Sequence, residues 1–293
     1  MRFTKMHGLG NDFIVIDCRK KKIAELSKLM KKLSHRQFGI GFDQAIILLP
    51  SKKADFRMDI YNADGGRVEM CGNGIRCIAK YIWDRKLSKK DVLDIETLAG
   101  IIKPKKAGNL IKVDMGAPIL EAKDIPMKIG SEFGVRSWKE ENSKSVVDYP
   151  LRIENKEFKI TCVSMGNPHC VIFVDDVNIF PVTQYGPIIE NHSLFPKRTN
   201  VEFVEIVSKK ELKMRVWERG SGETLACGTG ACASAVAAHL NKLAGRKVTV
   251  HLAGGDLKID WSEKDNHVYM TGPAIEVFEG FVKVPKNAFA FFG

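Results

Sequence analysis

The stretch LACGTGACASAVAAHL, residues 225–240, places Cys227 just before a glycine-rich turn and an alanine-rich segment of helical character. The stretch MCGNGIRCIAKYI, residues 70–82, gives Cys71 nearly the same setting. Glycine in such a turn lets a ligand approach the backbone closely. The reason why this arrangement occurs twice reveals how the chain is organised.

The two stretches belong to a longer internal repeat. The two cysteines are 156 residues apart (227 − 71), and at this offset FRMDIYNADGGRVEMCGNGIRCIA aligns without a gap on LKMRVWERGSGETLACGTGACASA. The same offset brings GLGNDFIVI onto SMGNPHCVI, with Asn11 on Asn167, and Gln44 onto Asn200. Because several separate motifs share one offset, we predict two copies of one α/β unit of about 120 residues.

Hydrophobic periodicity indicates the elements inside these copies. Helices are predicted at 23–36, 78–83 and 231–243, and strands at 43–49 and 56–61. Most other segments are short β-like runs between Gly, Asn, Asp and Pro turns. The charged segment Gly130–Val146 is predicted to be a surface excursion.

A cysteine at a glycine-rich helix start has a distinctive electrostatic setting. A helix N-terminus carries unpaired N–H groups and a partial positive charge, which favour an anion and a thiolate. Asn73 and Thr229 are residue types that favour the N-cap position. Each turn is therefore predicted to hold a carboxylate and to aim a thiol at the neighbouring carbon.

Two such turns facing one cleft indicate a particular reaction. One thiolate would remove the proton α to a carboxylate, and the opposing thiol would return a proton to the other face. The helix ends would stabilise the charge that develops on the carboxylate. The expected outcome is inversion at carbon, a racemisation or an epimerisation.

Composition excludes several other classes of protein. The 293 residues carry a net charge of +11, but the lysines are scattered and no aromatic-rich basic strand accompanies them, so we expect no nucleic-acid partner. No apolar run approaches the roughly 20 residues that a membrane span needs. The seven cysteines show no disulfide framework, and the first residues lack a secretion pattern. We therefore expect reduced thiols and a cytoplasmic location.

A metal site is a further alternative. It would use Cys71, Cys77, Cys227 and Cys232. Their spacing does not match the usual zinc motifs, and the repeat keeps only the first thiol of each pair. We expect no metal.

Five motifs resemble the diaminopimelate epimerase family: HGLGNDFIVID, YNADGGRVEMCGNGIRC, MGNPHCVIF, ERGSGETLACGTGACA and MTGPAIEVFEG. The resemblance implies an α/β (α+β) fold of two pseudo-symmetric repeats, each a curled, mostly antiparallel sheet around a central helix, with the active site in the cleft between them. It places the N-terminal repeat at 1–120, with 275–293 returning to it, and the C-terminal repeat at 121–274.

The resemblance also implies an activity, the interconversion of L,L- and meso-diaminopimelate for lysine and cell-wall precursor synthesis. The family is cofactor-independent, without pyridoxal phosphate, metal or nucleotide, and its members are typically homodimers. Ile75 departs slightly from the family pattern, which usually has a smaller residue there.

By the same resemblance, Cys71 and Cys227 form the acid/base pair, assisted by His169 and Glu218. The residues implied in substrate binding are Asn11, Gln44, Asn62, Gly72, Asn73, Asn167, Asn200, Glu218, Arg219, Gly228 and Thr229. The chemistry of these residues suits a substrate with an amino-acid group at each end. Arg219 can bind a distal carboxylate through two hydrogen bonds, and asparagine offers both a donor and an acceptor.

Three alternatives stay open from the residues alone. A proline, hydroxyproline or other amino-acid racemase would share the two-thiol mechanism, although adjacent Glu218 and Arg219 favour a substrate with a second charged end. A related isomerase of this fold that lacks the thiols is disfavoured by the presence of both cysteines. A non-catalytic binder of anions or nucleic acid would leave both cysteines dispensable.

Overall fold

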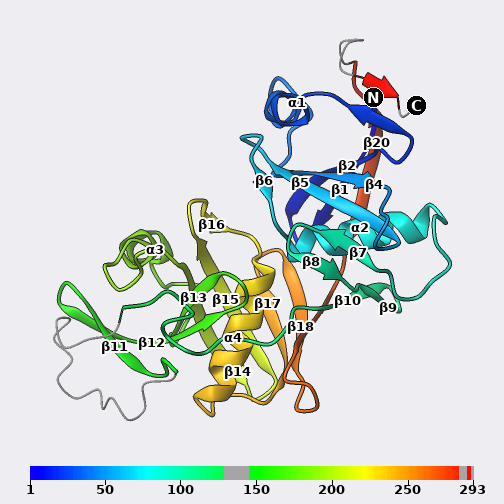
Figure 1. The fold of residues 1–293 in the computed structure, drawn as a ribbon. Helices are drawn as coiled ribbons and strands as arrows, with labels where there is room; N and C mark the ends of the chain where they lie inside the picture. The colour runs from blue at the N-terminus through cyan, green and yellow to red at the C-terminus, as the bar shows by residue number, and fades with distance from the viewer. Residues whose placement is uncertain (129–144, 284–288, 292–293) are drawn as a thin grey trace. The chain divides into compact units, whose positions relative to one another are not determined.

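The computed structural model describes residues 1–128, 145–283 and 289–291, and the chain divides into two compact units (Figure 1). The first unit contains Met1–Asp114 and Thr271–Gly293, and the second contains Met115–Met270. The segment 130–146, predicted to be a surface excursion, lies outside the described residues except for its last two residues.

The first unit is built on one mixed sheet. In spatial order its strands are β20 (Ile275–Phe281), β1 (Arg2–Gly8), β2 (Asn11–Asp17), β4 (Gln44–Leu49), β5 (Phe56–Asn62), β7 (Ile95–Thr97) and β8 (Gly100–Ile102), with β6 (Arg67–Val68) paired to β5. Only the pairs β2–β4 and β5–β7 of this order are parallel. Strands β9 (Lys105–Ala107) and β10 (Leu110–Asp114) pair antiparallel and belong to the larger sheet of eleven strands. Strands β3 (Lys21–Ile23) and β21 (Phe289–Phe291) form a separate antiparallel pair.

The second unit repeats this plan. In spatial order its strands are β11 (Tyr149–Ile153), β12 (Lys156–Ser164), β13 (Pro168–Phe173), β14 (Asn200–Ser208), β15 (Glu211–Glu218), β17 (Lys247–Leu252), β18 (Gly255–Trp261) and β19 (Val268–Gly272), with β16 (Gly222–Thr224) paired to β15. The pairs β13–β14 and β15–β17 are parallel, as are their counterparts in the first unit. Phe13 pairs with Gln44 and His169 with Asn200, both at the offset of 156. The predicted fold class is confirmed.

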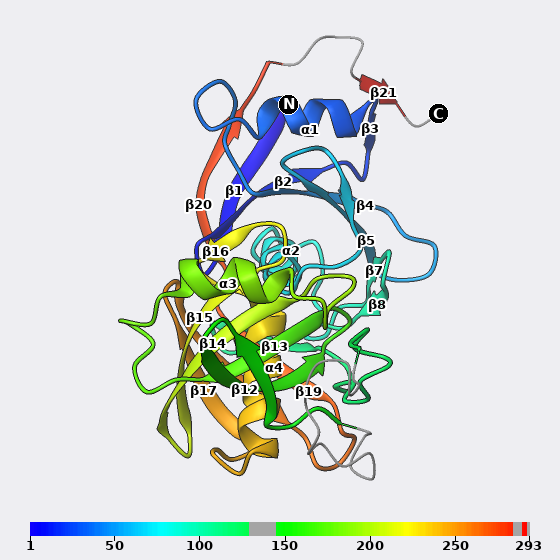
Figure 2. The ribbon, with the colours of Figure 1, turned by 90° about the vertical axis from the view of Figure 1, so that its left-hand side faces the viewer.

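Each sheet carries one helix on each face. Figure 2 shows α1 (Leu26–Leu33) and α2 (Gly72–Asp84) on opposite faces of the first sheet. In the second unit, α3 (Val182–Glu190) packs on β14 and β15, and α4 (Gly228–Leu240) packs on the strands from β12 to β18. Helices α2 and α4 start and end at the offset of 156. Within the described residues, no helix has the length and apolar content needed to cross a membrane.

Strand alternation decides which residues lie beneath α2 and α4. In the first unit Ile14 and Ile47 pack with Met30 of α1 in one buried cluster. Because successive strand residues point to opposite faces, Phe13 and Ile46 point toward α2. The corresponding positions in the second unit, beneath α4, hold His169 and Glu202.

All three predicted helices have different bounds in the structure. The helix predicted at 23–36 is shorter, because Ile23 belongs to β3 and Glu25 has a left-handed backbone (φ 50°) that interrupts a continuous helix. The helix predicted at 231–243 begins at Gly228 and ends at Leu240, and Lys242 beyond it has a positive φ of 61°. Helix α2 extends the prediction at 78–83 back to the glycine turn.

Candidate active site

Both cysteines are the N-cap residues of their helices. Cys71 and Cys227 have extended backbones, with φ of −140° and −118°, and the helices begin at the glycines that follow. The prediction of Asn73 and Thr229 as N-caps is wrong, because the glycines before them already belong to the helix. The Cys227 thiol itself caps α4, since Sγ accepts a hydrogen bond from the Gly230 backbone N–H at 3.4 Å.

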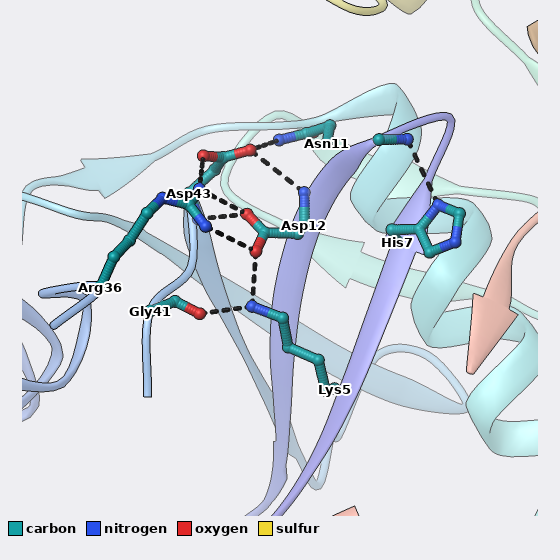
Figure 3. A network of polar contacts seen from close by, with 8 residues as sticks. Lys5, His7, Asn11, Asp12, Arg36, Gly41 and Asp43 are labelled. Atoms are coloured by element: carbon teal, nitrogen blue, oxygen red, sulfur yellow. Dashed lines mark hydrogen bonds and ion pairs between the residues drawn. The ribbon is translucent and has the colours of Figure 1, made fainter. Parts of the chain in front are cut away.

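The residues around Cys71 form what we call the N-terminal half-site. The half-buried Cys71 thiol donates to Asn11 Oδ1 at 3.7 Å, and Asn73 Nδ2 donates to the same oxygen at 3.3 Å. Asn11 Nδ2 donates to Asp43 Oδ2 at 3.0 Å, which fixes the orientation of the amide (Figure 3). The amide oxygen of Asn11 is thereby turned toward the helix start.

A charged network holds the Asn11 turn in place (Figure 3). Asp12 accepts hydrogen bonds from Arg36 at 3.0 and 3.1 Å and from Lys5 Nζ at 2.5 Å, and Lys5 also donates to the Gly41 carbonyl. Burial opposes ionisation of Asp12, but the hydrogen bonds from Arg36 and Lys5 outweigh it and lower its pKa to about 2. Asp12 is therefore an anion that ties β2 to the loop before β4.

The polar pair Gln44–Asn62 belongs to the same unit. Gln44 Nε2 donates to Asn62 Oδ1 at 2.8 Å, across the antiparallel pair β4–β5. Among the described residues, the buried Gln44 Oε1 has no hydrogen-bond partner. This acceptor is left for a ligand or for water.

The strand residues beneath the first turn of α2, which we call the floor of the N-terminal half-site, are apolar. A Cβ built on Gly74 of α2 would lie 3.4 Å from each of three atoms: Cys71 Cβ, Ile46 Cδ1 and Phe13 Cε1. Phe13 and Ile46 are both fully buried. The two strand residues that contact this turn are therefore apolar.

The residues around Cys227 form the C-terminal half-site, which is polar. The side chain of Cys227 is almost fully buried, and its Sγ lies 3.4 Å from Thr229 Oγ1. Asn167 Nδ2 donates to Thr229 Oγ1 at 3.3 Å, and Asn167 Oδ1 lies 3.1 Å from His169 Nε2. Four predicted site residues are thus linked by consecutive hydrogen bonds.

A buried carboxylate lies behind His169. Glu202 Oε1 is 2.7 Å from His169 Nδ1, and both side chains are 0% exposed. Burial, together with the negative charges of Glu218 and Glu202, raises the pKa of the Cys227 thiol well above its usual value. This shift favours the protonated thiol of Cys227 over the thiolate.

Glu218 lies next to this thiol. Its Oε1 accepts a hydrogen bond from Thr224 Oγ1 at 2.5 Å. Burial raises the pKa of Glu218, and hydrogen bonds from Thr224 and Cys227 partly oppose this effect. A carboxylate with a raised pKa is well suited to exchange a proton with a neighbouring thiol.

Arg219 and Asn200 are held together at the end of β15. Asn200 Oδ1 accepts from the Arg219 backbone N–H at 3.0 Å, and Asn200 Nδ2 donates to the Pro168 carbonyl at 2.8 Å. The exposed Arg219 guanidinium donates to the Lys197 carbonyl at 3.2 Å. This guanidinium is accessible to an anion.

In the first unit the structure brings Asn11 and Asn73 to Cys71 and pairs Gln44 with Asn62. In the second unit it brings the predicted residues together around Cys227 and Asn200. That the two half-sites share one cleft stays a prediction from the sequence, as do the domain limits at 120 and 275. Sequence reasoning missed Asp43 and Glu202. A signal for Glu202 is present in the sequence. The otherwise apolar strand segment VEFV carries this charged residue at the position where the first repeat has Ile46.

Among the described residues, no group of three or more His, Cys, Asp or Glu side chains is placed to hold a metal ion. All seven cysteines lie within the described residues, and none of them forms a disulfide.

The diaminopimelate epimerase family model matches residues 3–121 and 161–277. The chain belongs to the diaminopimelate epimerase family. A diaminopimelate epimerase of Moorella thermoacetica is 54% identical over 286 residues, which cover 96% of this chain and 98% of that protein. A diaminopimelate epimerase of Methanococcus maripaludis is 49% identical over 97% of this chain and 100% of that protein. The predicted family and the isomerase class are confirmed.

Solved structures share the fold of this family at low sequence identity. A phenazine biosynthesis protein of the PhzF family from Bacillus anthracis has a TM-score of 0.70 at 18% identity, covering 97% of this chain and 99% of that chain. A hydroxyproline epimerase from Agrobacterium vitis has a TM-score of 0.66 at 14% identity, covering 96% and 90%. These similarities support the architecture of two related units.

Proposed function

We propose that this chain interconverts L,L- and meso-diaminopimelate by proton transfer between two thiols, Cys71 and Cys227, without pyridoxal phosphate, metal or nucleotide. One observation carries the proposal: in a chain of this family, both cysteines are N-caps of equivalent helices in the two repeats. This equivalence supports a substrate carbon that meets one thiol from each side.

The proposed reaction proceeds through a carbanion. The thiolate of one cysteine takes the α-proton, and the electron pair left on carbon is stabilised by the adjacent carboxylate. The opposing thiol then gives its proton to the other face, so that one thiolate is consumed and one is formed. The raised pKa of Cys227 suits this residue to the role of proton donor, which leaves Cys71 as the base once its own thiol proton has been released.

The N-terminal turns of the two helices would bind the reacting carboxylate. The backbone N–H groups of Gly72–Asn73 and Gly228–Thr229 lie at helix starts, where the backbone dipoles of the first turn favour an anion. Binding through both turns would stabilise the charge that forms on the carboxylate in the transition state.

The second end of the substrate would be bound by polar side chains. Arg219 offers an exposed guanidinium for the distal carboxylate, and Glu218 offers an acceptor for an ammonium group. The remaining polar groups of the substrate are proposed to be bound by the side-chain amides of Asn11, Gln44, Asn62, Asn167 and Asn200. His169 and Glu218 would assist the thiols.

Further proposals concern the assembly and the location of the enzyme. We propose a homodimer, as is typical of the family, and a cytoplasmic location. A reducing compartment suits the proposed mechanism, because an oxidised Cys71 or Cys227 would be unable to exchange a proton.

Proton NMR in D₂O tests the function directly. L,L-diaminopimelate is incubated with reduced protein and no added cofactor. We expect loss of one α-proton signal together with appearance of the meso form. No exchange with folded, reduced protein contradicts the proposal, and exchange of proline or hydroxyproline in its place would assign the mechanism to another amino acid.

A further inference from the structure

Glu202 has no role in the reaction proposed above, yet it is the most deeply placed charge of the C-terminal half-site. Its Oε1 contacts His169 Nδ1, and its Oε2 is buried without a hydrogen-bond partner among the described residues. An ionised carboxylate at such a position is costly unless a cation compensates it. His169 is the side chain positioned to provide that cation.

The contacts of His169 determine its proton count. Nδ1 faces Glu202 Oε1 at 2.7 Å, and Nε2 faces Asn167 Oδ1 at 3.1 Å. A carboxylate only accepts hydrogen bonds, and so does an amide oxygen. The Asn167 NH₂ group is already directed toward Thr229 Oγ1. With the Asn167 amide in this orientation both ring nitrogens face acceptors, which is the hydrogen-bonding pattern of an imidazolium.

The direction of donation continues from His169 to the thiol. With Nε2–H donating to Asn167 and Asn167 donating to Thr229, the Thr229 hydroxyl hydrogen is free to point at Cys227 Sγ, 3.4 Å away. The Gly230 N–H donates to the same sulfur at 3.4 Å. A sulfur that receives two donors is stabilised as a thiolate.

We infer that Glu202 is a positioning residue, which holds His169 as an imidazolium and thereby orients the Asn167–Thr229 hydrogen bonds to stabilise the Cys227 thiolate. The inference rests on the proposed function for its relevance to turnover. No proton travels along this chain, because the amide of Asn167 only sets orientation. The Cys227 proton is exchanged with the substrate or with Glu218.

Glycine at position 230 makes the arrangement possible. A Cβ at Gly230 would lie 2.7 Å from Glu202 Oε1, closer than real Cβ atoms approach other atoms. The carboxylate therefore lies directly against the first turn of α4. The first repeat has no counterpart, because Phe13 and Ile46 occupy the positions of His169 and Glu202.

Three charged or titratable groups face Cys227 from the strands beneath α4: His169 of β13, Glu202 of β14 and Glu218 of β15. The remaining strands under this helix contribute Thr161 of β12 and apolar buried residues of β17 and β18 such as Val248, Val250, Leu257 and Ile259. Cys232 is the buried thiol of α4 itself. Few ionisable groups therefore influence the pH at which the Cys227 thiol ionises.

Two accounts predict opposite results for Glu202→Gln. One is the inferred chain of hydrogen bonds from Glu202 to Cys227, which we call the relay, and the other is simple charge repulsion. Repulsion alone would make Cys227 easier to ionise once the carboxylate is removed. The relay makes it harder, because His169 loses the anion that keeps it doubly protonated. We would measure carbamidomethylation of the Cys227 peptide by mass spectrometry from pH 6 to 11, with the Cys71 peptide as internal reference.

We expect Glu202→Gln to move the Cys227 midpoint upward by about one pH unit, the shift typical of losing one hydrogen bond to a charged group. Glu205→Gln is the matched control on the same strand, because Glu205 contacts Lys213 and lies outside the chain of contacts. Its Cys227 midpoint should equal that of the wild type. A downward shift or no shift in Glu202→Gln overturns the inference.

Two further measurements cover the case in which Glu202→Gln does not fold. Thr229→Val should raise the same midpoint, and Thr229→Ser should restore it. In the wild type, ¹⁵N NMR should show both ring nitrogens of His169 protonated at neutral pH, with the signal assigned by its loss in His169→Phe. An unprotonated Nε2 overturns the inference. None of these readouts needs substrate, so failure of the relay and failure of the proposed activity are distinguishable.

Discussion

The two half-sites have one backbone plan and two kinds of floor. In each, a cysteine caps a helix that lies on equivalent strands. An asparagine at the start of the strand beneath it, Asn11 at β2 or Asn167 at β13, contacts the helix start. Beneath Cys71 the floor is apolar, whereas beneath Cys227 it carries His169 and a carboxylate. Repetition thus supplied two geometrically matched thiols, and substitution of strand residues made their electrostatic settings different.

The starts of the equivalent strands β2 and β13 differ as well. At the position where the first repeat has Asp12, with its ion pairs to Arg36 and Lys5, the second has Pro168. One strand start is held by charges and the other by a residue with a fixed φ. The two half-sites should therefore respond differently to acid, to core substitution and to loss of their thiols.

The largest effect is expected from removing either thiol. Cys71→Ser and Cys227→Ser should each lower the rate of epimerisation by about a thousandfold or more, because a hydroxyl is a far weaker acid and base than a thiol. The rates of inversion and of α-proton exchange into D₂O should be measured separately for both stereoisomers. Near-normal inversion in either variant would contradict the two-thiol mechanism.

A second substitution tests whether the polar floor matters. His169→Phe gives the second repeat the residue that the first has at Phe13. We expect kcat to fall about ten- to hundredfold, the equivalent of one lost hydrogen bond to a charged group, with a smaller change in KM. Steady-state kinetics in both directions measures this, and wild-type kcat would show that the floor of the C-terminal half-site is dispensable.

The two helix glycines offer a matched pair for stability. Gly230→Ala should lower the free energy of unfolding by about 2 kcal/mol, because the added methyl group overlaps Glu202 Oε1. Gly74→Ala meets only 3.4 Å contacts and gains helix propensity, so it should change stability by less than about 1 kcal/mol. Urea unfolding compares the two, and equal losses would argue against a tightly held Glu202.

The charged turn should make the first unit sensitive to acid. The pKa of Asp12 is lowered from 3.8 to about 2 in the folded protein, so its contribution is full above pH 4 and is lost as the pH falls through 2. This contribution is about 2 kcal/mol. The difference in unfolding free energy between wild type and Asp12→Asn should shrink by that amount over this range, and a constant difference would contradict it.

Much of the fold could be predicted from the sequence alone, because the internal repeat aligns without gaps around the cysteines. The shared offset predicted two α/β copies, and it reappears in the strand register, where His169 pairs with Asn200 as Phe13 does with Gln44. The family, the fold class and the enzyme class were predicted correctly from this repeat and from the motifs.

What the sequence did not provide depends on three-dimensional contact. Asn73 and Thr229 fit the composition of N-caps, but the glycines before them adopt helical geometry and leave that position to the cysteines. His169 was identified only through the family resemblance, and Glu202 not at all. Their importance lies in a 2.7 Å contact between residues 33 positions apart.

The pairing of β20 with β1 has a consequence for synthesis. Strand β20 is the edge of the first sheet, but in the chain it follows the entire second unit. On the ribosome, the second unit is continuous and can fold as soon as it emerges, whereas the first must wait with β1 unpaired on that side. The part of the protein that is translated first is therefore completed last, and its exposed strand edge is where a nascent chain would need a chaperone.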